Sequence, residues 1–146
     1  MIGMFGAIDA AASGLTAERL RMDVISNNIA NVNTTRTAEG GAYRRQMVIF
    51  APMANGTNFA QVLSERLDAG NGGVRVMGIS KDNSPTHKLY DPAHPDANKD
   101  GYVEMPNVNI VTEMVDMITA TRAYEANVTV LNAAKSMALK ALEIGK

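Results

Sequence analysis

Apolar residues in the C-terminal part of the chain recur at heptad spacing, over a stretch that contains no helix breaker. Residues 107–144 include neither Gly nor Pro, which allows one continuous helix of about three times the usual length. Pro106 precedes the stretch and Gly145 follows it, as is typical of helix ends. The apolar residues form two rows, one of Ile110, Met117, Tyr124, Leu131 and Ala138, and one of Met114, Val128 and Leu142. This pattern predicts a long helix of coiled-coil type.

The first 35 residues carry a second heptad stripe, with Glu18 as its one charged interruption. Three glycines in the first half lower its helix propensity by about 1 kcal/mol each relative to Ala. The stripe consists of Met4, Ile8, Ala11, Leu15, Met22, Ile25, Ile29 and Val32. Because such a helix is marginal alone, we expect the two terminal helices to pack as a coiled-coil-like pair that also needs a partner surface.

A cluster of amide side chains lies beside this stripe. Asn27, Asn28 and Asn31 together lower helix propensity by roughly 2 kcal/mol, and some other interaction must offset that cost. One explanation is a solvated face. The other is a set of buried hydrogen bonds between helices, since an amide both donates and accepts and can fix helix register. The second explanation accounts better for the cost, and it predicts that these amides lie at helix contacts.

The periodicity changes between the two helical ends. The segments 43–51, 74–80, 86–90 and 101–105 have the composition of strands, and 59–67 has the spacing of a short helix. Asn55-Gly56 and the glycines of 70–73 indicate turns or loops. We therefore predict an α+β fold in which a small antiparallel β unit is inserted between two long terminal helices. The expected segments are 1–35 (helical), 36–106 (β domain) and 107–146 (helical).

Composition excludes several classes of partner. A formal net charge of −1 and an aromatic content of 5% provide neither the basic surface nor the stacking platform of a nucleic-acid-binding protein. The chain contains no cysteine, so no disulfide framework is expected. Residues 1–13 lack the cationic and apolar regions of a cleaved signal peptide. The helical stripes carry mixed charges rather than a basic polar face, which favours a protein partner over direct membrane insertion.

The clearest chemical motif is the segment from Asp96 to Gly101, which matches the first half of a calcium-binding loop. Asp96, Asn98 and Asp100 are therefore candidate metal ligands, but Asn107 stands where a bidentate Glu would close the site. The alternative is an Asp-Gly turn before a strand, which needs no ion. His87 and His94 show no zinc-binding spacing, and no serine lies in a nucleophile motif. We expect no enzymatic activity and no cofactor, with a calcium-dependent exported binding module as the alternative function.

Both ends of the chain contain motifs that resemble those of bacterial flagellar rod and hook proteins. One difference from those proteins is the segment from Thr35 to Gly41, which separates the Asn33-Thr34 pair from Tyr43. Segments in the middle of the chain resemble those of short rod proteins. The N-terminal motifs are Ser13-Gly14-Leu15, Arg21-Met22 and the run from Asn27 to Thr34. The C-terminal motifs are Asn107-Val108-Asn109, Glu113-Met114-Val115, Met117-Ile118 and the run from Arg122 to Asn127. The middle segments are Tyr90-Asp91-Pro92, His94 to Ala97 and Asp100 to Val103.

The resemblance implies a structural subunit of the proximal rod in the flagellar basal body. It implies export by the flagellar type III apparatus without a cleaved signal peptide, and helical assembly with copies of itself and with other rod proteins. We expect the assembly interface to include Ile8, Leu15, Met22, Ile25, Asn27, Asn28, Ile29, Asn31, Val32, Ile110, Met114, Met117, Tyr124, Val128, Leu131 and Leu142.

Overall fold

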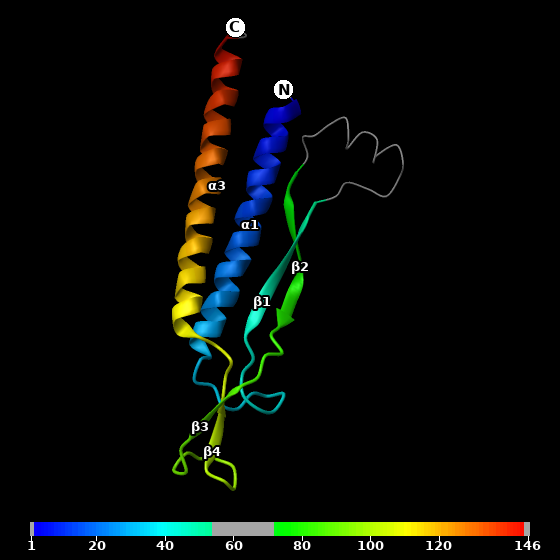
Figure 1. The fold of residues 1–146 in the computed structure, drawn as a ribbon. Helices are drawn as coiled ribbons and strands as arrows, with labels where there is room; N and C mark the ends of the chain where they lie inside the picture. The colour runs from blue at the N-terminus through cyan, green and yellow to red at the C-terminus, as the bar shows by residue number, and fades with distance from the viewer. Residues whose placement is uncertain (1, 54–71, 145–146) are drawn as a thin grey trace, which may run out of the picture. The chain divides into compact units, whose positions relative to one another are not determined.

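The computed structural model describes residues 2–53 and 72–144, and it confirms an α+β fold with a long helix toward each end of the chain (Figure 1). Helix α1 spans Ile2–Ala30 and helix α3 spans Ile110–Ile144. The intervening strands are β1 (Gln46–Pro52), β2 (Val74–Lys81), β3 (His87–Tyr90) and β4 (Tyr102–Met105). The short helix predicted for 59–67 and the Asn55-Gly56 turn lie outside the described residues.

The chain divides into two compact units, and each contains part of both long helices. The first comprises Met1–Leu20, Ile49–Gly78 and Ala120–Lys146, and the second comprises Arg21–Val48 and Ile79–Thr119. The second unit includes β3 and β4. Within the described residues, neither helix has the length and hydropathy needed to cross a bilayer.

In the first unit, α1 and α3 approach each other through small residues. Gly14 is buried, and a Cβ atom added to it would lie 2.8 Å from Asn127 Nδ2 of α3. This distance is too short for a real Cβ contact, so a side chain at this position would require the Asn127 side chain to shift. The other buried small residues among the described part of this unit are Gly6, Ala11, Ala17, Ala120 and Ala134. A seam of such residues buries little side-chain area but lets the two backbones come close.

The residues of α3 that are covered within the chain agree with one predicted heptad row and contradict the other. Met117, Tyr124, Leu131 and Ala138 of the first row are half-buried, although Ile110 is exposed. The second predicted row is wrong as a row of the intrachain seam, because Met114 and Leu142 are exposed. The covered row lies one position earlier in the heptad and consists of Glu113, Ala120, Asn127 and Ala134. Choosing the larger apolar residues selected the wrong row, since close helix packing favours small side chains.

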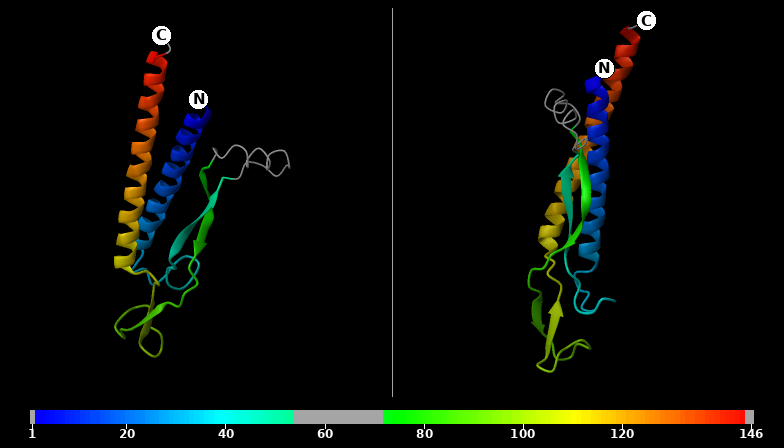
Figure 2. Two further views of the ribbon diagram at one scale, coloured as in Figure 1. Left: turned by 45° about the horizontal axis from the view of Figure 1, so that its top comes forward. Right: turned by 90° about the vertical axis from the view of Figure 1, so that its right-hand side faces the viewer.

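The strands form two separate two-stranded sheets (Figure 2). Strands β1 and β2 are antiparallel, because Met53 N donates to Gly73 O at one end and Asp82 N donates to Arg45 O at the other. Strands β3 and β4 are also antiparallel, with His87 opposite Met105. All four predicted strands are present, but they do not join into one sheet. A two-stranded sheet is marginal alone, so other parts of each unit must support it.

In the first unit, α1 supplies such support to the β1–β2 pair. Val74 N donates to Ser13 Oγ at 3.1 Å, and Ser13 Oγ in turn donates to Ala10 O within the helix. Inward and outward residues alternate along β2, so one face of the strand is partly covered and the other is exposed. The helix thus contributes a hydrogen bond to the first residue of β2.

Helix α3 begins at Ile110, three residues later than predicted from Pro106. The reason is Asn109, whose Oδ1 accepts hydrogen bonds from Val111 N at 3.0 Å and Thr112 N at 3.3 Å. This is the geometry of an N-cap. The side chain of Asn107, which the prediction placed inside the helix, bonds instead to the segments around β1 and β2.

The Asp100-Gly101 segment forms the predicted turn before β4. Gly101 N donates to Asn98 O at 3.0 Å, and Gly101 has a φ of 80°, a conformation that favours glycine. A Cβ atom on Gly101 would also lie 2.9 Å from Tyr90 Cε2. The rings of Tyr90 and Tyr102 meet edge to face at a centroid distance of 5.3 Å. The turn therefore holds the end of the hairpin in a geometry that leaves no room for a side chain at this glycine.

We predict that Gly101→Ala lowers the free energy of unfolding by about 1–2 kcal/mol, because Ala is strained at positive φ. Gly78→Ala is the matched control, since a Cβ atom at Gly78 would have no heavy atom within 4 Å and the φ of this residue is not positive. Urea unfolding followed by circular dichroism would measure both changes. Equal stability of the two variants would contradict this account of the turn.

Candidate functional site

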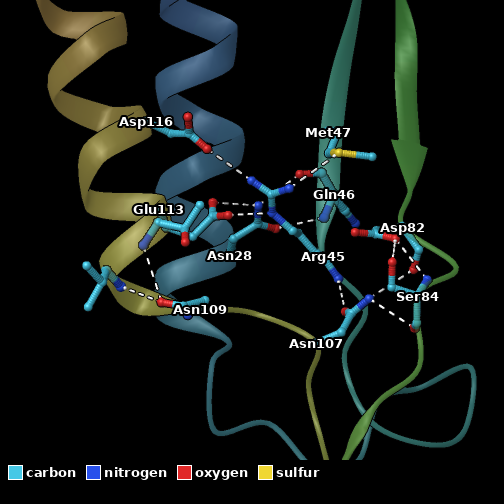
Figure 3. A network of polar contacts seen from close by, with 12 residues as sticks. Asn28, Arg45, Gln46, Met47, Asp82, Ser84, Asn107, Asn109, Glu113 and Asp116 are labelled. Carbon is cyan, nitrogen blue, oxygen red and sulfur yellow. Dashed lines mark hydrogen bonds and ion pairs between the residues drawn. The ribbon is translucent and has the colours of Figure 1, made fainter.

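A buried polar network in the second unit is centred on Asn28, near the C-terminal end of α1 (Figure 3). Asn28 is 1% exposed. Its Nδ2 donates to Glu113 Oε2 at 2.9 Å and to Gln46 O at 2.8 Å. Its Oδ1 accepts from Gln46 N at 2.9 Å and from Tyr43 OH at 3.0 Å. Both amide N–H groups and both oxygen lone pairs are therefore used, which is the full capacity of the side chain.

Glu113 of α3 is 0% exposed and forms an ion pair with Arg45. Arg45 Nε donates to Glu113 Oε1, and Arg45 Nη2 donates to Asp116 Oδ2 at 3.0 Å. Arg21 Nη2 of α1 lies 3.8 Å from the other oxygen of Asp116. Burial lowers the pKa of Arg45, but the hydrogen bond with Glu113 and the charges of Glu113, Asp116 and Asp82 outweigh it, so the net pKa is raised. The Arg45 guanidinium therefore stays charged at neutral pH.

Two further contacts position Arg45 and its neighbours. Asn107 Oδ1 accepts from Arg45 N at 2.8 Å, and Asn107 Nδ2 donates to Asp82 O at 3.2 Å. Burial raises the pKa of Tyr43, and the nearby Glu113 charge raises it further. The Tyr43 hydroxyl thus keeps its proton and can donate it to Asn28.

The structure separates the three amides that the sequence grouped together. The interpretation as a buried interhelical hydrogen bond is confirmed for Asn28. It is wrong within the chain for Asn27, which is exposed, and for Asn31, whose Nδ2 donates to Asn27 O at 2.9 Å. Asn31 Oδ1 accepts from Thr34 Oγ1. Adjacent residues of a helix cannot face the same partner, and Asn31 lies beyond the last residue of α1, where its side chain helps to end the helix.

Sequence reasoning missed the Arg45–Glu113 ion pair. Arg45 was assigned only to a strand, and Glu113 only to a family motif. The signal that could have revealed Glu113 is its heptad row, in which Ala120, Asn127 and Ala134 follow at seven-residue intervals. A charged residue at such a position indicates either an error in the register or a buried partner.

Most predicted interface residues are already partly covered inside the single chain. Ile25 is buried. The half-buried residues are Ile8, Leu15, Met22, Ile29, Val32, Met117, Tyr124, Val128 and Leu131. Ile110, Met114 and Leu142 are exposed. A role of any of these residues in contacts with other subunits stays a prediction.

A group of exposed apolar side chains lies on α3 in the second unit, and we name it the α3 apolar patch. It consists of Val111, Met114, Val115 and Ile118, which are 70%, 54%, 57% and 53% exposed. Their spacing of three, four and seven residues places them on one helical face. Glu113 lies on a different face and is buried. One side of this part of α3 therefore packs within the chain, while another presents apolar surface to solvent.

Two of the three candidate calcium ligands, Asp96 and Asn98, accept hydrogen bonds through their side chains. Asp96 Oδ2 accepts from Thr35 Oγ1 at 2.8 Å, and Asn98 Oδ1 accepts from the backbone N–H groups of Asp100 and Tyr102. Among the residues that the structure describes, no three His, Cys, Asp or Glu side chains are grouped to hold a metal ion. The turn explains this segment, and the calcium-dependent alternative is not supported.

We predict that Asn28→Ala lowers the free energy of unfolding by at least about 2 kcal/mol, because it leaves buried groups of Gln46, Tyr43 and Glu113 without a partner. The matched control Asn27→Ala changes the adjacent, exposed amide and is expected to stabilise the helix by roughly 0.5 kcal/mol. Urea unfolding of both full-length variants would test this contrast. If the two substitutions shifted stability in the same direction, the assignment of Asn28 as the buried amide would be wrong.

Two family models match the two ends of the chain. The model described as flagella basal body rod protein matches residues 8–36, and the model described as flagellar basal body rod FlgEFG protein C-terminal matches residues 99–144. These segments contain Asn28 and Glu113, respectively. The matched regions therefore include the residues through which α1 and α3 contact each other in the second unit.

Curated relatives extend the match to almost the whole chain. The flagellar basal-body rod protein FlgC of Borreliella burgdorferi is 58% identical over 149 aligned positions, which cover 98% of both chains. The FlgC protein of Bacillus subtilis is 48% identical over 97% of this chain and 98% of its own. That of Escherichia coli O157:H7 is 37% identical over 99% of this chain and 100% of its own. With identities this high over nearly its full length, the chain belongs to the FlgC family of flagellar basal-body rod proteins.

Proposed function

We propose that the chain is a structural subunit of the flagellar basal-body rod, which assembles through its terminal helices with copies of itself and with other rod proteins. The observation that carries this proposal is the α3 apolar patch, which is exposed on a helix that matches the rod-protein family. The names of its relatives support the same function. In this role the protein transmits torque as part of the drive shaft and catalyses no reaction.

The patch has the properties of a helix docking surface. Its four side chains follow the spacing of a helical stripe, so one partner helix can contact all of them. Burying the exposed parts of these side chains would contribute about 3–6 kcal/mol in total. A patch of this kind on a single chain is typical of an interaction site. The other subunits of the rod are the partners that the family membership supports.

The internal contacts support a fixed pairing of the two helices within each unit. In the second unit Asn28 contacts Glu113, and in the first unit Gly14 lies against Asn127. Each contact opposes sliding of one helix along the other within its own unit. A helix pair that cannot slide is suited to carrying load along a filament, because buried polar contacts oppose a change of register.

The route to the rod is also part of the proposal. The resemblance to rod and hook proteins supports export by the flagellar type III apparatus, without a cleaved signal peptide. Rod assembly then takes place at the basal body.

We predict that Ile118→Asp abolishes motility, because it places a carboxylate in a surface that becomes buried on assembly. The substitution is expected to have little effect on the isolated chain, since Ile118 is more than half exposed. Ser136→Asp is the matched control, because Ser136 is exposed on α3 and lies about five turns from Ile118 on the same helical face. Swimming in soft agar and basal-body yield would be measured in cells whose own copy of the gene is deleted.

Equal amounts of both variants in the cell would show that the substitutions leave expression unchanged. Normal rods with Ile118→Asp would contradict the assignment of the α3 apolar patch to assembly. Loss of rods with Ser136→Asp as well would show that the effect is not specific to the patch.

A further inference from the structure

The hydrogen bonds at the α1–α3 contact in the second unit come mostly from a third segment. Five hydrogen bonds involve the Asn28 amide and the Glu113 carboxylate, and one of them joins the two helices directly. The other four come from residues 43–46, which we name the strand-entry segment. The two helices therefore do not satisfy their own polar groups at this contact.

Glu113 shows why this dependence matters. Its carboxylate is fully buried between the helix seam and the strand-entry segment. A buried carboxylate is strongly unfavourable unless it is paired with a cation and hydrogen-bonded. Arg45 supplies both the positive charge and a hydrogen bond. Asp116 accepts a hydrogen bond from its guanidinium, and Asn107 accepts one from its backbone N–H.

Asn28 depends on the same segment from the side of α1. Its Oδ1 accepts from Gln46 N and Tyr43 OH, and its Nδ2 donates to Gln46 O as well as to Glu113. Without the strand-entry segment, the Asn28–Glu113 contact would retain one hydrogen bond, and the Glu113 carboxylate would enter the helix contact without its cation.

We propose that Asn28 and Glu113 make the pairing of α1 with α3 conditional on docking of the strand-entry segment. The two helices then pair stably only in a chain whose residues 43–46 are in place, and a helix pair formed without them is unstable. This goes beyond a role in fixing helix register, which the direct contact between Asn28 and Glu113 could perform alone. It also differs from the proposed assembly function, because it concerns the order of events within one chain.

The test measures hydrogen exchange of the full-length purified chain, in peptides that cover residues 21–30 and 110–119. In the wild-type protein both segments are expected to be protected. Arg45→Met keeps the apolar stem of the side chain and removes its charge, so exchange in both helix segments should become on the order of 100-fold faster. Arg44→Met is the matched control, because Arg44 is exposed, and it should leave both segments unchanged.

The double variant Arg45→Met/Glu113→Met separates the proposal from a general loss of folding. It removes the buried charge together with its partner, so protection of both helix segments should return to within about tenfold of wild type. This rescue is expected even if Arg45→Met alone unfolds the chain. Failure of the double variant to regain protection would overturn the proposal, as would wild-type segments that show no protection.

A second comparison tests the coupling itself. Asn107→Ala removes the acceptor of Arg45 N and loosens the strand-entry segment without touching Asn28 or Glu113. In the wild-type background, exchange of residues 21–30 should become about tenfold faster. In the Arg45→Met/Glu113→Met background the same substitution should have a smaller effect, because no buried charge then depends on the segment. Equal effects in both backgrounds would mean that the helices pair independently of the segment, and the proposal would fail.

Discussion

The ion pair between Glu113 and Arg45 is the interaction on which the second unit of this protein depends. A carboxylate that is completely buried in a helix contact is stable only if neighbouring groups pair with its charge and donate hydrogen bonds to it. It needs a cation, which Arg45 provides just before β1, and a neutral donor, which α1 provides through Asn28. Three segments that are distant in sequence are thereby joined by a few polar atoms rather than by a large apolar core.

The two units use different physical means to join the same pair of helices. In the first unit the contact depends on small residues, and the absence of a side chain at Gly14 leaves room for the Asn127 side chain. In the second unit it depends on hydrogen bonds and charge. Packing of small residues requires that the two helix surfaces fit sterically, but it does not require particular residue types. A buried polar group requires specific hydrogen-bond or charged partners. Together they leave the larger apolar side chains of α3 free for other contacts.

This division explains why the exposed apolar residues of α3 are so numerous. If Val111, Met114, Val115 and Ile118 packed within the chain, the helix would have to rotate and Glu113 would turn toward solvent. The buried ion pair opposes that rotation, because breaking it would also leave Arg45 and Asn28 without the Glu113 carboxylate as a partner. The same interaction that closes the inner side of α3 therefore keeps the α3 apolar patch exposed to solvent.

The sequence by itself determined the long helices, the four strands, the Asp-Gly turn and the family. These features depend on local signals, such as the absence of Gly and Pro, β-branched runs and motif residues, which are visible along the chain. Only the tertiary structure decided which heptad row of α3 is buried and which of Asn27, Asn28 and Asn31 is the interhelical amide. The reason is that a row of Glu, Ala and Asn is unfavourable in a helix contact unless its polar groups have partners. Those partners lie in another part of the chain, where Arg45 pairs with Glu113 while Tyr43 and Gln46 bond to Asn28.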